Sequence, residues 1–314
     1  MLVHGFYLAL SLLILFAGAE GLVRGSSSIA RRLGLTPLVI GLTVVAFGTS
    51  MPELVVSLSA TLRGSGDLAA GNVVGSNIFN IGVILALAAL VCPIRVDAAV
   101  VRADAPIMIA ASLVLGGLLF FGHVSRLAGL LLFAALVAYI AWSIRAARRQ
   151  ASAIVEQEFA EGIPSVSASV WRDVLFLVGG LAVLVAGSRL LVFSATEMAR
   201  GFGVSEAIIG LTIVSAGTSM PELATSVLAA FRRQADIAVG NLIGSNLFNI
   251  FGIVGISALA APLSAPGITT FDLVVMLVFA IGVLPLLWTG LRLHRWEGAL
   301  LLFIYVVYLA ILWP

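Results

Sequence analysis

Long apolar blocks separated by short polar segments run through the whole chain. A helix needs about 20 mainly apolar residues to cross a bilayer, and ten blocks meet that requirement. Their approximate limits are 3–23, 36–62, 68–92, 103–122, 125–144, 172–196, 205–231, 236–261, 271–290 and 296–313. The pattern therefore predicts an all-α integral membrane protein with ten transmembrane helices.

One longer polar stretch interrupts this pattern. Residues 145–171 contain three arginines and three glutamates. The stretch divides the chain into a first repeat of five helices at 1–144, a linker at 145–171, and a second repeat of five helices at 172–314. The linker is too short to form a separate regulatory domain.

Composition agrees with a lipid environment. Of the 314 residues, 61% are hydrophobic and 10% are charged, and the mean hydropathy is +1.18, whereas soluble domains carry about 25% charged residues. The basic residues are all arginines, spread between the apolar blocks, and the net charge is only +2, so nothing favours nucleic-acid binding. Cys92 is the single cysteine, which excludes an internal disulfide.

The arginines also predict an orientation. If the N-terminus lies outside, 13 of the 17 arginines fall in segments on the cytoplasmic side, as the positive-inside rule requires. We therefore expect an inner (plasma) membrane protein with both termini outside and the linker in the cytoplasm. Glu20 and Arg189 lie near the ends of their blocks, and we expect each to snorkel to the membrane interface.

The two halves contain the same two motifs at a constant offset. GLTVVAFGTSMPEL at 41–54 returns as GLTIVSAGTSMPEL at 210–223, and AAGNVVGSNIFNIG at 69–82 returns as AVGNLIGSNLFNIF at 238–251. Both displacements are 169 residues. Because five spans is an odd number, the second copy must enter the membrane from the opposite side. Such inverted repeats are the plan of many secondary transporters and place equivalent residues around one site at the midplane.

The first motif, Gly-Thr-Ser-Met-Pro-Glu, predicts a break in its helix. Proline lacks an amide hydrogen and clashes with the preceding turn, and the upstream glycine adds backbone freedom. The freed carbonyls can then act as oxygen ligands where they line a polar cavity. Hydroxyl oxygens at the same depth come from Thr49, Ser50, Thr218 and Ser219.

The glutamates of this motif are the strongest indication of function. Glu53 and Glu222 lie deep in apolar spans, with no basic residue within two helical turns. A charge at such a depth costs about 2.5–3.5 kcal/mol on insertion scales. One divalent cation, two monovalent cations or two protons would each neutralise a facing pair. That equivalence is the basis of an exchange mechanism, in which one site accepts alternative loads.

The second motif adds neutral oxygens at helical spacing, so that they share one helix face. These candidates are Ser76, Asn80, Ser245 and Asn249, with Asn72 and Asn241 one turn earlier. We expect Asn77 and Asn246 to be packing or capping residues. A ligand set of oxygens without cysteine or histidine favours calcium or sodium, with magnesium and manganese as alternatives, over zinc and copper.

These motifs resemble the alpha-repeats of the sodium/calcium exchangers, in the calcium:cation antiporter superfamily. The resemblance implies a calcium ion between the carboxylates of Glu53 and Glu222 and the carbonyls of Thr49 and Thr218. It also implies movement of spans 3–23 and 172–196 against the other helices. The sodium sites that it implies use the carbonyls of Ala46 and Ser215 and the side chains of Ser50, Ser219, Ser76 and Ser245, with Asn80 and Asn249 at the centre.

One departure leaves the counter-ion open, because several sodium/calcium exchangers have aspartate where this chain has Asn249. We predict a secondary antiporter that exports calcium in exchange for sodium, with a calcium/proton or other divalent cation/proton antiporter as the alternative. Inverted repeats disfavour a channel. The absence of a base beside Ser50 or Ser219 disfavours a hydrolase, so we expect no enzyme, no cofactor and no obligate protein partner.

Overall fold

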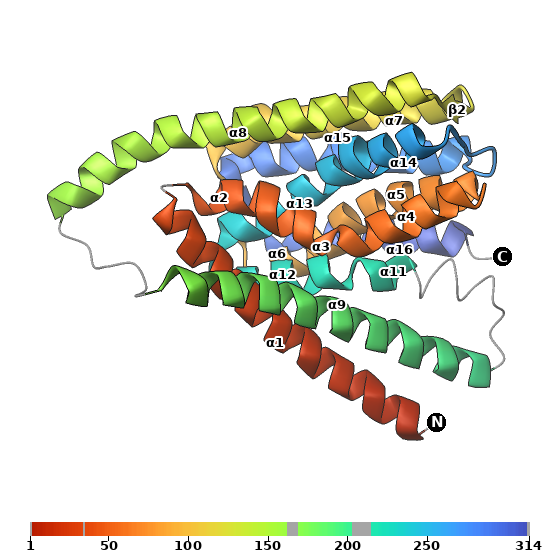
Figure 1. Ribbon diagram of the computed structural model, residues 1–314, viewed down its shortest axis with the longest axis horizontal. Coiled ribbons are helices and arrows are strands. Elements are labelled where there is room, and N and C mark those ends of the chain that lie inside the picture. The colour runs from red at the N-terminus through yellow and green to blue at the C-terminus, as the bar shows by residue number, and fades with distance from the viewer. Residues whose placement is uncertain (1, 34, 162–168, 203–214, 313–314) are drawn as a thin grey trace.

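The computed structural model describes residues 2–33, 35–161, 169–202 and 215–312, and nearly all of them are helical (Figure 1). Helices are expected for such apolar blocks, because a backbone in lipid must satisfy its own hydrogen bonds. Two very short strand pairs join loops at the ends of the helices. The predicted all-helical architecture is confirmed.

The elements of the first half are α1 (Leu2–Arg32), α2 (Pro37–Ile40), the π-helical η1 (Gly41–Val45), α3 (Ala46–Thr49), α4 (Met51–Leu62), α5 (Gly66–Phe79), the π-helical η2 (Asn80–Leu85), α6 (Ala86–Val91), β1 (Ile94–Arg95), the π-helical η3 (Val100–Asp104), α7 (Ala105–Phe120), β2 (His123–Val124) and α8 (Arg126–Glu161).

The elements of the second half are α9 (Val170–Gly201), α11 (Ser215–Thr218), α12 (Met220–Phe231), α13 (Ala235–Leu247), the π-helical η5 (Phe248–Val254), α14 (Gly255–Ala260), β3 (Leu263–Ser264), α15 (Thr270–Trp288), the 3₁₀ turn η6 (Thr289–Leu291), β4 (Arg292–Leu293) and α16 (Arg295–Leu312).

Within the described residues, eight helices are long and apolar enough to cross a membrane. A ninth span forms if Leu38–Thr49 and Met51–Leu62, which meet at a 48° bend, are counted together. The remaining predicted span, 205–231, is described only in α11 and α12, and its residues 205–214 lie outside the described part. A count of ten therefore stays a prediction.

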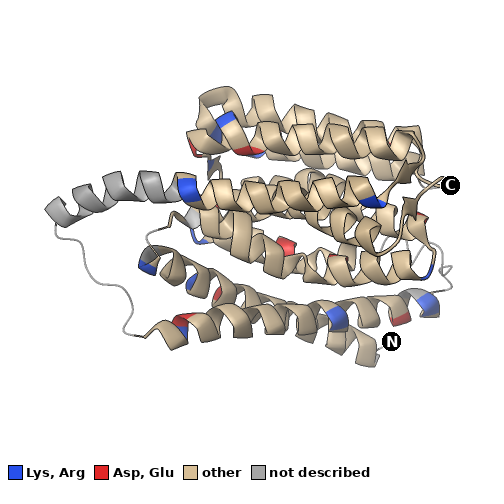
Figure 2. Ribbon diagram, turned by 45° about the horizontal axis from the view of Figure 1, so that its top comes forward, with Lys and Arg blue, Asp and Glu red and all other residues tan. Residues whose placement is uncertain are grey.

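The motif helices form the core of the molecule. In the span Gly66–Val91, 78% of the 18 residues that form its apolar segment are buried, and in Ala235–Ala260 the share is 89%. In Val170–Met198 it is only 22%. Helices α1 and α9 lie side by side, apart from most of the bundle (Figure 1). Their outward faces expose large apolar side chains, such as Leu13 at 68% and Leu175 at 71%, which lipid would cover. Most charged residues gather towards the two ends of the helices (Figure 2).

Two helices extend beyond their predicted limits. Helix α1 continues to Arg32 instead of ending near residue 23, and α8 continues to Glu161 instead of ending near residue 144. No proline or glycine interrupts residues 145–161, which are rich in alanine, arginine, glutamine and glutamate, and these residues favour helix even when they are polar. More than half of the predicted linker is therefore a polar extension of α8.

Candidate ion-binding site

Both copies of the first motif break their helix at the serine. Ser50 separates α3 from α4 with φ −82° and ψ 9°, and Ser219 separates α11 from α12 with φ −87° and ψ 9°. Pro52 and Pro221 stand in the first turn of the following helix, where proline is tolerated because that N–H would be unpaired anyway. The break leaves each glutamate in the first turn of a new helix, whose N-terminal dipole favours a negative charge.

The two broken helices exchange hydrogen bonds across the centre of the molecule. Ser50 Oγ donates to Glu222 Oε1 at 2.7 Å, and Ser219 Oγ donates to Glu53 Oε1 at 2.9 Å. The two contacts are related by the sequence offset of 169 residues. Each motif therefore supplies the carboxylate of one pair and the hydroxyl of the other, as two copies related by a two-fold axis would do.

Asparagines of the second motif hydrogen-bond the backbone of the helices that carry the glutamates. Asn72 Nδ2 donates to the Glu53 carbonyl at 3.2 Å and to Ser57 Oγ at 2.9 Å. Asn241 Nδ2 makes the same two contacts, to the Glu222 carbonyl at 3.4 Å and to Ser226 Oγ at 2.9 Å. These asparagines therefore contact the backbone of the acidic residues, which leaves the carboxylates free for other partners.

A third reciprocal set joins the asparagines at the C-terminal ends of α5 and α13. Asn80 Nδ2 donates to Asn246 Oδ1 at 2.9 Å, and Asn249 Nδ2 donates to Asn77 Oδ1 at 3.1 Å. The π-helical segment η2 begins at Asn80, and η5 includes Asn249. Such wide turns occur frequently at functional sites.

Several buried oxygens of these motifs have no hydrogen-bond partner among the residues that the structure describes. They are Glu53 Oε2, Glu222 Oε2, Asn80 Oδ1, Asn249 Oδ1 and Ser245 Oγ. Most buried polar atoms in proteins are hydrogen-bonded, so each exception needs an explanation. Acidic, amide and hydroxyl oxygens are the ligands that calcium takes, and a cation bound between the motifs would satisfy them.

The other predicted residues lie in the same region. Thr49 Oγ1 donates to Asn241 Oδ1 at 3.1 Å, so its hydroxyl is engaged while its carbonyl belongs to the last residue before the break. The Ala46 carbonyl accepts the Ser50 N–H at 3.0 Å. Ser76 Oγ lies 3.3 Å from Ser219 Oγ, and Thr218 is buried. Ser215 begins α11, but its side chain lies outside the described part.

The site is acidic and buried. Both glutamates are at most 2% exposed, and within the described part of the chain no arginine forms an ion pair with either of them. Among these residues no cluster of three or more histidine, cysteine, aspartate or glutamate side chains forms a metal site. Two uncompensated buried charges are costly, so the centre requires cations or protons.

Sequence reasoning did not assign three features of the site. Asn77 and Asn246, which we expected to be packing or capping residues, also hydrogen-bond Asn249 and Asn80. Ser57 and Ser226 accept hydrogen bonds from Asn72 and Asn241. All four recur at the offset of 169, and that recurrence was the available signal. Ser188 Oγ donates to the Gly217 carbonyl at 2.6 Å, a contact that no motif indicates.

The fold and this site define an integral membrane protein in which two repeated motifs meet at a buried acidic centre. A family model described as "Sodium/calcium exchanger protein" matches residues 3–145 and 173–313. The chain belongs to this family, whose members are exchangers and not enzymes, and the resemblance found in the motifs is confirmed.

Similar proteins cover nearly all of the chain. The inner membrane protein YrbG of Escherichia coli is 38% identical, with 100% of this chain and 98% of that protein aligned. The sodium/calcium exchanger MaX1 of Methanosarcina acetivorans is 32% identical over 97% of each. A structure of the sodium-calcium exchanger NCX_Mj soaked with Na⁺ and Sr²⁺ superimposes with a TM-score of 0.85 at 30% identity, covering 99% of both chains.

Proposed function

We propose that this protein is a secondary antiporter that exports calcium in exchange for sodium, with Glu53 and Glu222 as the shared binding groups. The supporting observation is the pair of buried carboxylates, joined by reciprocal serine hydrogen bonds. Each carboxylate keeps one oxygen without a hydrogen-bond partner in the described part of the chain. One calcium ion or two sodium ions would neutralise this pair. The names of similar proteins, MaX1 and NCX_Mj, also point to sodium and calcium.

In this proposal the calcium ion lies between the two carboxylates and the carbonyls of Thr49 and Thr218. The oxygens of Asn80 and Asn249 line the centre, since both are buried without a partner. Sodium ions occupy neighbouring positions formed by the carbonyls of Ala46 and Ser215 and the hydroxyls of Ser50, Ser219, Ser76 and Ser245.

We also infer that the two halves are inverted repeats of five spans each, at 1–144 and 172–314. Two observations support the inversion. Ile94 pairs with Leu293 in one strand pair, and Val124 pairs with Leu263 in the other. An offset of 169 converts Ile94 into Leu263 and Val124 into Leu293, so the two strand pairs are reciprocal, as the serine–glutamate pairs are. In Figure 1, α3 to α4 runs from left to right, whereas α11 to α12 runs from right to left.

The proposed orientation places both termini outside and the segment 145–171 in the cytoplasm. The distribution of arginines supports it. With the site closed in the described conformation, transport requires that it open to one side at a time. The helices proposed to move are α1 and α9, which pack along each other at the edge of the bundle.

Calcium uptake into proteoliposomes tests this function. Purified protein is reconstituted, and uptake is measured with an outward gradient of sodium, of protons, or of potassium, and with no gradient. We expect uptake with the sodium gradient alone. The double variant Glu53→Gln/Glu222→Gln provides the background.

Each other result has a distinct meaning. Uptake driven only by protons supports the alternative antiporter. Rapid calcium flux without any counter-ion gradient identifies a channel. Uptake no greater than that of the double variant under every gradient contradicts calcium antiport.

A further inference from the structure

Resting on the proposed function, we propose that Asn77 and Asn246 are positioning residues that orient the amides of Asn249 and Asn80. Each accepts a hydrogen bond from the NH₂ end of its partner. The oxygen end of the partner amide is then directed to the cation. The orienting residue itself does not touch the ion.

An asparagine amide can be turned either way in a pocket of a given shape. Its carbonyl oxygen is an acceptor and its NH₂ group is a donor of nearly the same size. Only the oxygen can bind a cation, because the NH₂ group would direct the positive ends of its N–H dipoles at the ion. A site that relies on asparagine therefore needs a second group to select the orientation.

The structure supplies that group twice. Asn80 Nδ2 lies 2.9 Å from Asn246 Oδ1, and Asn249 Nδ2 lies 3.1 Å from Asn77 Oδ1. The Oδ1 atoms of Asn80 and Asn249 are buried, and no residue that the structure describes donates a hydrogen bond to them. Turning the amide of Asn80 or Asn249 alone would place its carbonyl oxygen against the carbonyl oxygen of the orienting asparagine, so the turn would require both residues to move.

The orienting asparagines differ in how they are themselves held. Asn246 Nδ2 lies 3.4 Å from the sulfur of Met108 on α7, a weak acceptor. Asn77 Nδ2 has no hydrogen-bond partner in the described part of the chain. Asn246 therefore has a defined orientation of its own, whereas Asn77 is fixed mainly by the amide of Asn249.

A packing role for Asn77 and Asn246 makes a different prediction. Leucine has nearly the same shape as asparagine, so it would preserve packing while removing the acceptor. A packing residue would also be insensitive to whether its partner is an amide or a carboxylate. An orienting residue is needed only when the partner has an NH₂ end, because aspartate presents an oxygen in either orientation.

The experiment is a double-mutant comparison in proteoliposomes. Asn246→Leu is made alone and with Asn80→Asp, and Asn77→Leu is made alone and with Asn249→Asp. The half-saturating calcium concentration and the maximal rate are measured for each, and every double variant is compared with its own aspartate single variant.

We expect each leucine substitution alone to raise the half-saturating concentration about tenfold, the effect of losing a hydrogen bond at a buried polar pair. In the aspartate backgrounds we expect a change of less than twofold. Less than a twofold change for both leucine variants alone overturns the inference. Equal losses in the asparagine and aspartate backgrounds also overturn it and indicate a packing role.

The failure of the proposed function is distinguishable from the failure of this inference. If the wild type shows no gradient-driven calcium uptake, both fall; if it does, only the positioning role is in question. Folding is checked by gel filtration and thermal melting. Where a leucine variant does not fold, the alanine variant at the same position removes the acceptor without adding an apolar branch, and the same two outcomes apply to it.

Discussion

At the centre of the molecule, the serine–glutamate, asparagine–asparagine and asparagine–carbonyl contacts recur in both halves at the offset of 169 residues. The helices α1 and α9, which stand at equivalent positions beside this centre, share the closely packed glycines Gly18 and Gly187 at that offset but differ in other contacts. In the proposed site a cation would therefore meet nearly equivalent ligands from both halves, while the helices that flank the site are held differently.

The packing of α1 on α9 illustrates this difference. A Cβ at Gly180 would lie 2.4 Å from the Leu22 nitrogen, and one at Gly25 would lie 2.5 Å from the Leu177 nitrogen. The positions equivalent to these two glycines are Ser11 and Ser194. The ion pair between Arg32 and Asp173, at 2.6 Å, joins the two helices at the same end, where α1 finishes and α9 begins. In Figure 1 the two helices cross near this end, and towards the other end His4 and Phe193 still pack with ring centroids 6.0 Å apart.

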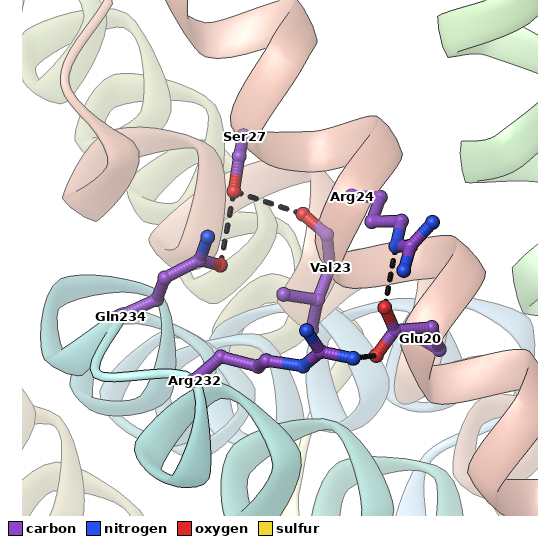
Figure 3. Close-up of polar contacts among 6 residues, drawn as sticks. All are labelled: Glu20, Val23, Arg24, Ser27, Arg232 and Gln234. Atoms are coloured by element: carbon purple, nitrogen blue, oxygen red, sulfur yellow. Dashed lines mark hydrogen bonds and ion pairs between the residues drawn. The ribbon is translucent and has the colours of Figure 1, made fainter.

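The anchoring of α1 to the bundle differs in the same way. Glu20 pairs with Arg24 and, at 2.7 Å, with Arg232 in the turn after α12, and Ser27 donates to Gln234 Oε1 at 3.0 Å (Figure 3). We expected Glu20 to snorkel to the membrane interface. In the structure its carboxylate forms ion pairs with these two arginines. The equivalent of Glu20 in α9 is Arg189, for which no ion pair exists within the described part of the chain. In the proposed mechanism, opening to the two sides would therefore disrupt different contacts.

The largest expected effect tests the equivalence of the centre. Glu53→Gln and Glu222→Gln should each lower gradient-driven calcium uptake by at least 100-fold. At an effective dielectric of about 20, a unit charge pair at 4 Å contributes about 4 kcal/mol, and each variant loses one charge facing a divalent ion. Initial uptake rates at a fixed sodium gradient measure this. If one single variant retained wild-type uptake, the two carboxylates would not form one site.

The next effect concerns the close packing of α1 and α9. Gly180→Ala should lower the melting temperature by several degrees and uptake by about tenfold, because forcing extra atoms between packed backbones typically costs 1–3 kcal/mol. Gly179→Ala is the matched control, since a Cβ at Gly179 would meet nothing within 4 Å. Thermal melting and uptake are measured on both. Equal behaviour of the two variants would show that the close crossing is not required.

The meeting of the two motifs at one buried centre could be predicted from the sequence, because both motifs recur at one offset. The breaks at Ser50 and Ser219 follow from a proline and a glycine placed within a few residues of each other. The same offset relates Asn77 to Asn246, but it does not say which residue Asn246 contacts. Its partner Asn80 is 166 residues away, and only packing decides which of the neighbouring asparagines meet.

The ends of helices and the contacts of charged residues were also beyond prediction. The polar sequence after residue 144 is compatible with both a loop and a helix, and its alanines and arginines favour the helix that is observed in α8. Glu20 finds Arg232 because α1 lies against the turn after α12, and no local pattern indicates that approach.

A smaller effect is expected from the carbonyl that proline leaves unpaired in the second half. Pro221 cannot offer an N–H to the Gly217 carbonyl, which instead accepts from Ser188 Oγ at 2.6 Å. Ala19 stands at the equivalent position in α1 and has no hydroxyl. Ser188→Ala should destabilise the protein by about 1 kcal/mol, the usual value of one hydrogen bond. This corresponds to about 2 °C in the melting temperature.

Ser194→Ala is the control for this measurement. The Ser194 hydroxyl donates to the Leu190 carbonyl within α9 at 2.7 Å, so its removal leaves no carbonyl of a broken helix unsatisfied. We expect its melting temperature to match that of the wild type. A larger loss for Ser194→Ala than for Ser188→Ala would contradict the role assigned to the contact with Gly217.

The smallest effect is expected from the ion pair that anchors α1. Glu20→Gln removes the pairing with Arg232, and partly exposed ion pairs contribute about 0–1 kcal/mol. The uptake rate should therefore change by less than about fivefold, and by less still in high salt, because salt screens such pairs. Arg189→Gln, at the equivalent position in α9, should leave the rate unchanged. A change of equal size in both variants would show that the two flanking helices are anchored alike and that the contrast between α1 and α9 does not extend to their charges.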